Sequence, residues 1–385
     1  MSKKIDFLIP PRSNYLVLTY LLKKIYEAFV RLEYDCRLVS SDDFFSSSVN
    51  DPPDFLFGMN GVPFNKERQM LCDIIKKPYF SYLTAPPYRF HEVIGSPYVY
   101  VGCDDRYGCE FMDDMGFERS YFFPNGVDKN LSPDPKIDRD IDVLMPATFM
   151  DYESLREEWW KLLPKIVCKV MDDAIEITLS DNQTSFMKAF SDAYKAHLGL
   201  SENPKKIGFD LALPLMLIEG YIKGKERVDF VKSITDAKVT LLNGHQQGHP
   251  GWEKVLGDKY KNITLHEPAS FYDTIELMKR SKIVLNCYSQ NKEGSHDRVF
   301  NAFACGALSM TNENVFLKDF FEDEKNILFY QSYKLEDVNA KLNKFLADEE
   351  LRQHVAEAGR QEVMANHTWD CRILALSDLW EEFLA

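Results

Sequence analysis

The fold is decided by residues 286–307, which read NCYSQNKEGSHDRVFNAFACGA. The apolar run at 283–287, which overlaps the beginning of this stretch, predicts a buried strand, and the polar, glycine-containing residues that follow predict a loop. A short helix is expected to begin near Asp297 and to stop at Gly306, where the next strand starts. Strand, loop, helix and strand in this order are typical of a parallel sheet flanked by helices.

The start of this helix predicts an anion site, because ligands of open parallel sheets bind at the carboxyl ends of the strands. A helix start offers backbone N–H groups and a positive dipole end to a diphosphate, and Arg298 can add a charge-assisted hydrogen bond. Asn301 follows Asp297 by four residues and Arg298 by three, so the three side chains can share a helix face. The structural alternative is that Asp297 merely caps the helix and pairs with Arg298.

Strand-like runs extend this pattern through the second half of the chain. They are expected at 141–145, 238–242, 262–265, 283–287, 307–311 and 327–330. Helical periodicity dominates the region between the first two of these runs, at 155–170, 185–198 and 211–233. We therefore expect a helical insertion at about 151–235, and from Leu335 onwards an almost wholly helical chain.

The first half of the chain predicts a second sheet of the same kind. A helix is expected at 14–32, and strands are expected at 4–9, 54–57, 79–83, 98–102 and 120–123. Residues 132–138, SPDPKID, have the composition of a linker. The pattern thus predicts an α/β protein with one lobe at 1–137, a second lobe at 138–370 that contains the insertion, and a last helix at 371–385 that packs back on the lobes.

Composition excludes several classes of protein. The net charge of −14 argues against nucleic-acid binding, which needs a basic face. No apolar run is long enough for a signal peptide or a membrane span, so we expect a cytoplasmic protein for which only peripheral membrane contact remains open. Its eight cysteines form no C-x-x-C pair, and no His, Cys and carboxylate cluster has metal-ligand spacing, so no metal is expected.

Residues 293–306 resemble the donor-site motif of retaining GT-B glycosyltransferases, which is Glu-x7-Glu followed by Ala-x-Ala-x-Gly. Glu293 occupies the first acidic position, whereas Asn301 stands at the second. The resemblance implies that Glu293 contacts hydroxyls of the transferred sugar and that Asn301 replaces the residue that binds the ribose. An amide still hydrogen-bonds a ribose diol, although without the strength of a charged acceptor.

Two further stretches agree with this resemblance. Residues 124–128, PNGVD, resemble the sequence that closes the first lobe of many such enzymes, and residues 367–372, HTWDCR, resemble the H-T-W-x-x-R segment of the branch named for the spore-maturation protein CgeB. The match covers about 120–148 and 238–385, and the remainder matches only by general pattern. It implies the GT-B fold, in which two Rossmann-like lobes face a central cleft.

The candidate donor site follows from the motif and from the predicted strand ends. Glu293 and Arg298 are the candidate catalytic residues, Arg298 because it can hold the leaving diphosphate. Glu267 follows a strand at the place where the family usually binds the nucleobase. The full set of further donor-binding candidates is Thr148, Asn243, Gly244, Glu267, Tyr288, Ser289, Gly294, Ser295, His296, Asp297 and Asn301. For those outside the motif, a purely structural role in a loop is the alternative.

The acceptor is expected on the first lobe. A retaining enzyme needs no base there, because the leaving phosphate takes the proton of the acceptor, whereas an inverting enzyme needs a carboxylate or histidine. His91, Asp104 and Asp105 are candidates for such a base, and Arg12 and Asn14 are expected to border the acceptor.

The sequence therefore predicts a metal-independent, hexosyltransferase-like glycosyltransferase, retaining rather than inverting. It would move a sugar from a nucleoside-diphosphate sugar, its donor substrate, to a glycan, protein or lipid-linked acceptor, and no cofactor is expected. One alternative is a catalytically silent protein that binds sugar nucleotides or glycans on the same fold, for which Asn301 is the best argument. A GT-B epimerase or phosphorylase is a third reading, although no lysine stands out as the cofactor site that a phosphorylase needs.

Overall fold

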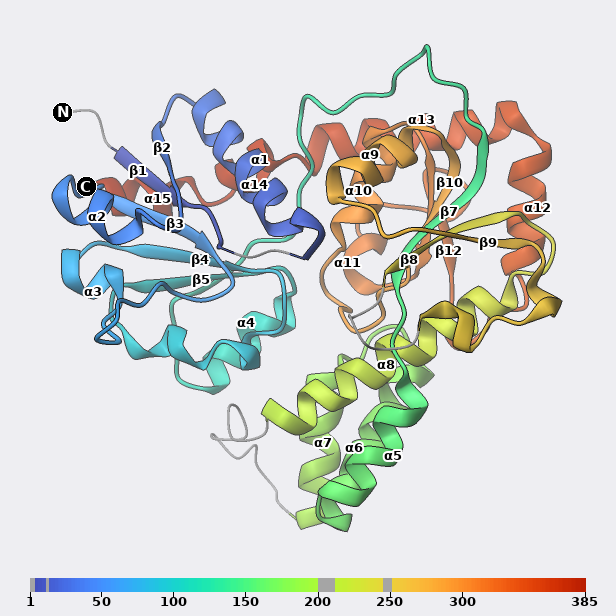
Figure 1. Ribbon diagram of the computed structural model, residues 1–385, viewed down its shortest axis with the longest axis horizontal. Helices are drawn as coiled ribbons and strands as arrows, with labels where there is room; N and C mark the ends of the chain where they lie inside the picture. The colour runs from blue at the N-terminus through green and yellow to red at the C-terminus, as the bar shows by residue number, and fades with distance from the viewer. Residues whose placement is uncertain (1–3, 12–13, 200–211, 245–250) are drawn as a thin grey trace. The chain divides into compact units, whose positions relative to one another are not determined.

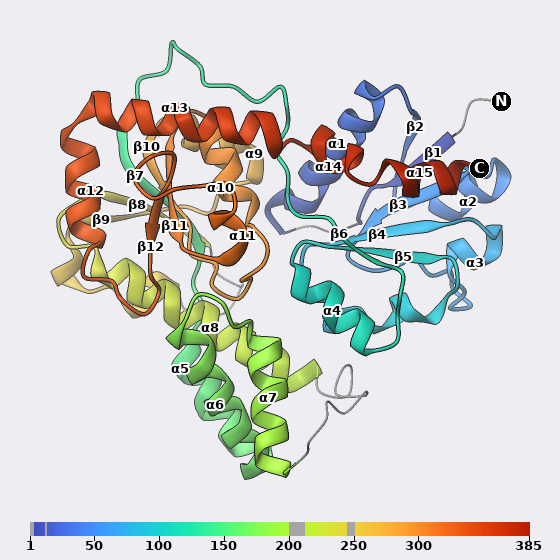
Figure 2. The ribbon, with the colours of Figure 1, turned by 180° about the vertical axis from the view of Figure 1, so that it is seen from behind.

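The structure is a computed structural model that describes residues 4–11, 14–199, 212–244 and 251–385. It contains two compact units, each built on a six-stranded parallel sheet (Figures 1 and 2). The first unit comprises Met1–Asn130 and Asn366–Ala385, and the second comprises Leu131–Ala365. The chain leaves the first unit at Asn130 rather than at residue 137, and the segment that returns to it begins at Asn366 rather than at residue 371.

The sheet of the first unit has the order β2-β1-β3-β4-β5-β6. Its strands are β1 (Lys4–Leu8), β2 (Asp35–Val39), β3 (Phe55–Met59), β4 (Tyr79–Leu83), β5 (Val99–Cys103) and β6 (Ser120–Phe122). Of these six, β2 was not expected from the sequence. It is an edge strand whose Arg37 donates two hydrogen bonds to the buried carboxylate of Asp6 in β1, so it lacks the apolar run of a central strand.

The helices of the first unit come from both ends of the chain. They are α1 (Val17–Arg31), α2 (Phe44–Asn50), α3 (Leu71–Ile75), α4 (Arg106–Asp114), α14 (Trp369–Leu374) and α15 (Ser377–Leu384), with short 3-10 turns η1 (Asn14–Leu16), η2 (Pro87–Arg89) and η3 (His91–Gly95). The single helix expected at 371–385 is thus two helices. The first starts earlier, because the Thr368 hydroxyl accepts a hydrogen bond from the Cys371 N–H and caps it.

Aromatic side chains from the sheet and from the C-terminal segment form the core of the first unit. The ring of Trp380 on α15 lies 4.8 Å from that of Phe80 and 5.5 Å from that of Phe29, and it stacks on Phe55. Its indole N–H donates to the carbonyl of Ile373, so this buried polar group is satisfied. The returning segment is therefore part of the core rather than a tail on its surface.

The sheet of the second unit has the order β12-β11-β10-β7-β8-β9, and the sequence predicted each of its strands. They are β7 (Ile141–Thr148), β8 (Val239–Gly244), β9 (Ile263–His266), β10 (Ser281–Leu285), β11 (Leu308–Asn312) and β12 (Leu328–Tyr330). From β7 the chain proceeds outward to β8 and β9, then crosses back to β10 on the other side of β7. The topological switch point, where ligands of such sheets bind, therefore lies between β7 and β10.

The helices of the second unit include the predicted insertion between β7 and β8. The inserted helices are α5 (Tyr152–Leu162), α6 (Lys165–Ser180), α7 (Phe186–Leu198) and α8 (Ala212–Ser233). The others are α9 (Phe271–Lys279), α10 (Asp297–Ala304), α11 (Val315–Lys318), α12 (Val338–Ala347) and α13 (Glu349–Asn366), with 3-10 turns η5 (Trp252–Lys254) and η6 (Asp258–Tyr260).

The insertion extends away from the sheet of this unit but remains packed on it through α8 (Figure 1). Phe230 of α8 stacks on Tyr330 of β12, with ring centroids 4.1 Å apart. The helix expected at 155–170 is interrupted at Pro164, since proline has no N–H and disfavours helical geometry in the residue before it.

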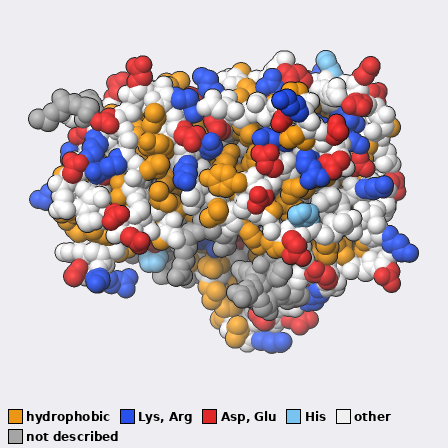
Figure 3. All heavy atoms as spheres, turned by 45° about the horizontal axis from the view of Figure 1, so that its top comes forward, with side chains coloured by type: hydrophobic (Ala, Val, Ile, Leu, Met, Phe, Trp, Pro, Cys, Tyr) orange, Lys and Arg blue, Asp and Glu red, His pale blue; other side chains and the backbone are white. Residues whose placement is uncertain are grey.

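Charges of both signs are interspersed on the face shown in Figure 3. Such mixing is typical of a globular surface and differs from the continuous basic area of a nucleic-acid-binding face. Among the described residues, the longer helices lack the apolar stretch that would be needed to cross a bilayer.

Candidate donor-binding site

The candidate site lies at the carboxyl edge of the second sheet, in the loop from β10 to α10. We call residues 286–296 the donor loop. Asn286 opens it and is 2% exposed. Its N–H donates to the carbonyl of Met310, its side-chain amide donates to the hydroxyl of Thr311, and its carbonyl accepts from the hydroxyl of Tyr330. The neighbouring strands β11 and β12 thereby fix the start of the loop.

Arg298 is oriented by this asparagine. Its guanidinium donates a hydrogen bond of 2.7 Å to Oδ1 of Asn286, so the arginine of α10 is directed to the carboxyl end of β10. Burial lowers the pKa of Arg298 to about 10, which still leaves the group charged at neutral pH. Arg298, a candidate from the sequence, is thus a cation held at the strand end where an anionic ligand is expected.

A second arginine, which sequence reasoning missed, lies at the adjacent strand. Arg227 of α8 donates a 2.9 Å hydrogen bond to the carbonyl of Thr148, the last residue of β7. Because β7 and β10 pair directly, the two arginines bond to the carboxyl ends on either side of the switch point. Burial is the main cause of the lowered pKa of Arg298. The attraction of Asp297 opposes this shift, whereas repulsion from Arg227 adds to it. Arg227 lies within a long helix outside any motif, and only the tertiary fold reveals its position.

The N-terminus of α10 differs from the expectation. The ring Nδ1 of His296, rather than Asp297, caps the helix by accepting the N–H of Arg298 at 3.1 Å, and it also lies 2.7 Å from a carboxylate oxygen of Asp297. This N–H is therefore already bonded instead of open to a ligand. Burial lowers the pKa of His296, and the attraction of Asp297 opposes that shift.

Asn301, at the second position of the motif, is 1% exposed. Its amide NH2 donates to the carbonyl of Asp297 at 2.8 Å and lies 3.4 Å from the Asp297 carboxylate. Its Oδ1 has no hydrogen-bond partner among the described residues. A glutamate here would bring a second carboxylate close to that of Asp297, so the neutral amide fits the helix as it stands.

The backbone around Glu293 is held by hydrogen bonds from the start of α11. The side-chain amide of Asn314, which starts this helix, donates to the carbonyls of Gly294 at 2.9 Å and Asn291 at 3.3 Å. Ser295 is buried, with its hydroxyl 3.3 Å from the carbonyl of His296. Glu293 itself is half-buried. The backbone on both sides of the candidate sugar-binding carboxylate is therefore fixed.

Other predicted donor residues share this edge of the sheet. Tyr288 donates its N–H to the Asn312 side chain, and its ring lies edge-on to that of His296 at 4.5 Å. Thr148 ends β7 and Gly244 ends β8. The side chain of Asn243 bonds to Glu253 and to the N–H of Trp252, so it holds the turn η5. Glu267 is exposed just after β9.

The acceptor-side candidates belong to the first unit. Asn14 begins η1, and His91 lies exposed in η3, 3.7 Å from Glu92. Asp104 and Asp105 follow β5 directly and are both buried, and Asp105 accepts the N–H of Tyr107 as the cap of α4. Arg12 lies outside the described residues.

The two remaining family-like segments, 124–128 and 367–372, pack on each other within the first unit. Val127 exchanges backbone hydrogen bonds with His367 and Trp369. Arg372 donates to the carbonyls of Pro124 and Asn125, both at 3.2 Å. A Cβ at Gly126 would lie 2.9 Å from the Trp369 ring, so glycine is required there. These segments join the returning chain to the first sheet.

Within the described parts of the chain, no group of three or more His, Cys, Asp or Glu side chains is arranged to hold a metal ion. Arg227 and Arg298 bring positive charge to the candidate donor site.

Comparison with known proteins identifies the fold. The chain has the fold of an Anabaena protein, HepE, solved with UDP-glucose, at a TM-score of 0.56 and 10% identity, over 98% of this chain and 99% of that one. An α-glucosyltransferase solved with UDP and a DNA 13-mer gives a TM-score of 0.58 at 10% identity, over 99% of each chain. Sucrose-phosphate synthase from Thermosynechococcus elongatus gives 0.55 at 9% identity, over 99% of this chain and 98% of that one.

The fold is accordingly that of GT-B glycosyltransferases, with two Rossmann-like lobes. Residues 226–378 match the family model described as glycosyl transferase-like, and the matched segment includes the donor loop, α10 and Arg227. A search of curated proteins finds no significant match to the sequence.

Proposed function

We propose that this protein is a glycosyltransferase that moves a sugar from a nucleoside-diphosphate sugar to an acceptor, without a metal ion. The observation that carries the proposal is the pair Arg227 and Arg298. Each is tied by one hydrogen bond to the carboxyl end of a strand, and the two strands flank the switch point. Two cations brought together at a ligand-binding edge suit the two charges of a diphosphate.

These arginines would supply the electrostatic work of catalysis. When the bond between the anomeric carbon and the diphosphate breaks, negative charge grows on the leaving phosphate oxygens. Charged guanidinium groups already oriented by Asn286 and by the Thr148 carbonyl stabilise that charge without reorganising. In other enzymes a metal ion stabilises this charge, and we propose that Arg227 and Arg298 do so here.

The sugar and the ribose are assigned by the motif. Glu293 would accept hydrogen bonds from sugar hydroxyls. Since the NH2 of Asn301 is bonded to Asp297, a ribose hydroxyl would have to donate to Oδ1, the atom that has no partner among the described residues. A ligand bond there would satisfy a buried acceptor that otherwise carries a desolvation cost.

We further propose that the reaction retains the anomeric configuration. The acceptor oxygen forms its bond to the anomeric carbon on the face that the diphosphate leaves, and its proton passes to the departing phosphate oxygen. The Glu-x7-Asn motif, which resembles that of retaining enzymes, supports this assignment. Within the class, the segment 367–372 and the residues around Arg298 favour the CgeB-like branch and a hexosyl donor, and the composition favours a cytoplasmic location.

The decisive experiment is incubation with a panel of UDP-, GDP-, ADP- and dTDP-sugars, with and without chelator, while release of free nucleoside diphosphate is measured. UDP-glucose stands first, because HepE was solved with it. Release that continues with excess chelator supports the proposal. Binding by calorimetry without release on any acceptor class would instead favour the catalytically silent protein that Asn301 suggests. If the protein neither binds any of these nucleotide sugars nor releases nucleoside diphosphate from them, the proposed donor site is refuted.

A further inference from the structure

The inserted helices contact the donor loop through buried charged side chains. Lys292, directly before Glu293, is 1% exposed, and its ammonium donates to the carbonyls of Asp181 at 2.9 Å and Thr178 at 3.2 Å. These carbonyls belong to the end of α6, where a helix leaves acceptors unpaired and its dipole is negative. The lysine therefore joins the loop to the end of an inserted helix.

A buried carboxylate on α8 makes the second connection. Glu226, 4% exposed, accepts the N–H of Ser289 at 3.1 Å and the hydroxyl of Ser332 at 2.5 Å. The hydroxyls of Ser289 and Ser332 lie 2.6 Å apart, which closes a small polar network. Burial raises the pKa of Glu226, while Ser332, the positive charge of Lys292 and the Ser289 N–H oppose that shift.

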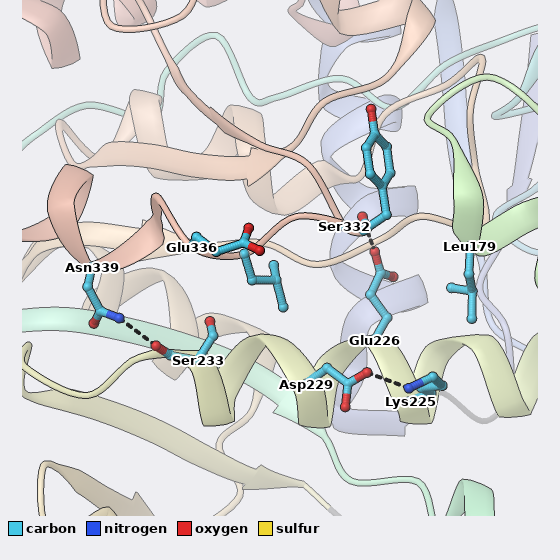
Figure 4. A pocket seen from close by; sticks show the side chains of 10 residues that line it. Leu179, Lys225, Glu226, Asp229, Ser233, Ser332, Glu336 and Asn339 are labelled. Atoms are coloured by element: carbon cyan, nitrogen blue, oxygen red, sulfur yellow. Dashed lines mark hydrogen bonds and ion pairs between the residues drawn. The ribbon is translucent and has the colours of Figure 1, made fainter.

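A pocket lies beside this polar network. Glu226 and Ser332 also line a pocket of about 570 Å³ along α8, which Leu179, Asp229 and Glu336 help to form (Figure 4). The hydrogen bond from the Ser289 N–H to the carboxylate thus joins the donor loop to α8 beside this pocket.

On its other side, the same stretch of loop is bonded to α11. The N–H of Val315 donates to the carbonyl of Lys292 at 3.0 Å, and Asn314 bonds to Asn291 and Gly294. Residues 289–294 are thus held between the insertion and α11. Glu293 lies inside this held stretch, one residue after Lys292.

We propose that Lys292 and Glu226 are positioning residues through which the helical insertion sets the donor loop and places Glu293 for the sugar. The insertion then belongs to the donor site instead of being an appendage to it. The part of the inference that concerns the sugar rests on the proposed function, whereas the part that concerns the loop does not.

The first test is hydrogen exchange on the full chain without ligand. Lys292→Met keeps the apolar stem and removes the ammonium, and Glu226→Gln removes the second charge with little change of shape. In either variant, exchange in peptides that cover 289–294 should rise about 10-fold or more, because each change removes a charged hydrogen-bonding partner of this stretch. Lys282→Met is the matched control, since Lys282 pairs with Asp142 at the opposite end of β10. Unchanged exchange at 289–294 in both variants, or a uniform rise over the whole second unit, would overturn the proposal.

The second test separates the sugar from the diphosphate. Calorimetry with the nucleotide sugar that the wild type binds, and with its nucleoside diphosphate, should show that Lys292→Met weakens the former about 10-fold and the latter less than about 2-fold. Equal weakening of both would contradict the placement of Glu293. If the wild type binds no nucleotide sugar, the proposed function fails, and hydrogen exchange still decides whether the insertion positions the loop.

Discussion

Arg298 and Asn286 form a hydrogen bond of 2.7 Å in which the guanidinium donates to the side-chain oxygen, and this bond joins α10 to the carboxyl end of β10. The amide of Asn286 is occupied on its other side by Thr311. The arginine is therefore oriented before any ligand arrives, and a site oriented in advance binds charge more tightly than a flexible one.

Replacement of this arginine tests its assignment. Arg298→Ala should weaken the nucleoside diphosphate roughly 10- to 100-fold, the range expected for loss of a charged hydrogen bond, and should abolish turnover. Calorimetry and product release measure the two effects. Arg280→Ala is the control, because Arg280 pairs with Asp140 on the surface. Turnover that survives in Arg298→Ala would remove this residue from the mechanism.

Replacement of Arg227 should also weaken binding of the nucleoside diphosphate through its phosphates. Arg227→Met is expected to weaken the nucleoside diphosphate by about 10-fold or more, while affinity for the nucleoside without phosphate stays unchanged, because the arginine is assigned to the phosphates alone. Arg156→Met, which breaks an ion pair with Asp172 elsewhere in the insertion, controls for general damage to these helices. Equal losses for nucleoside and diphosphate would point to a structural effect.

The contacts of Asn301 lead to a prediction about the stability of its variants. Asn301→Asp places a second carboxylate about where the amide now lies 3.4 Å from that of Asp297, so it should destabilise the fold by about 1–3 kcal/mol. Asn301→Leu has nearly the same shape and also removes Oδ1, which has no hydrogen-bond partner among the described residues, so its cost should be smaller. Urea unfolding of the two variants gives the comparison. A leucine variant less stable than the aspartate variant would contradict the role given to charge.

His367 predicts a dependence of stability on pH. Burial, with repulsion from Arg372 added, lowers its pKa to about 3, and its Nδ1 lies 2.7 Å from the Arg372 guanidinium. Between pH 3 and the unfolded value of about 6.5, only the unfolded chain takes up this proton, so stability falls as the pH falls through that window.

The contribution of this histidine is at most about 1.4 kcal/mol per pH unit. His367→Asn keeps an acceptor near the guanidinium but does not titrate. Urea unfolding at pH 7 and 5.5 should therefore show a smaller loss of stability in the variant than in the wild type. Identical losses in both proteins would show that His367 is protonated in the folded state as well.

Much of the fold could be predicted because the strands of the second sheet are apolar runs separated by polar loops. The edge strand β2 escaped prediction, since Asp35 and Arg37 break its apolar pattern and its pairing depends on Asp6 of a distant strand. The break at Pro164 was visible in the sequence, because proline interrupts helical hydrogen bonding, but the apolar periodicity on both sides concealed it.

The candidate site could be predicted only in part for a related reason. The donor loop is contiguous, so its motif shows Glu293, Arg298 and Asn301 together. Arg227 belongs to a helix of the insertion and reaches the site only because α8 passes the end of β7. In the sequence, Lys292 is indistinguishable from an ordinary loop lysine. It is buried because the end of α6 packs against it and accepts its hydrogen bonds. Contacts between segments far apart in the sequence leave no local signal.

The return of the chain to the first unit has a consequence for synthesis. Trp380 packs among aromatic rings of the first sheet, although the last strand of that sheet ends at Phe122, far earlier in the chain. On the ribosome, the second unit, contiguous in sequence, emerges complete while the first still lacks part of its core. The unit whose translation starts first is therefore the one that finishes folding last.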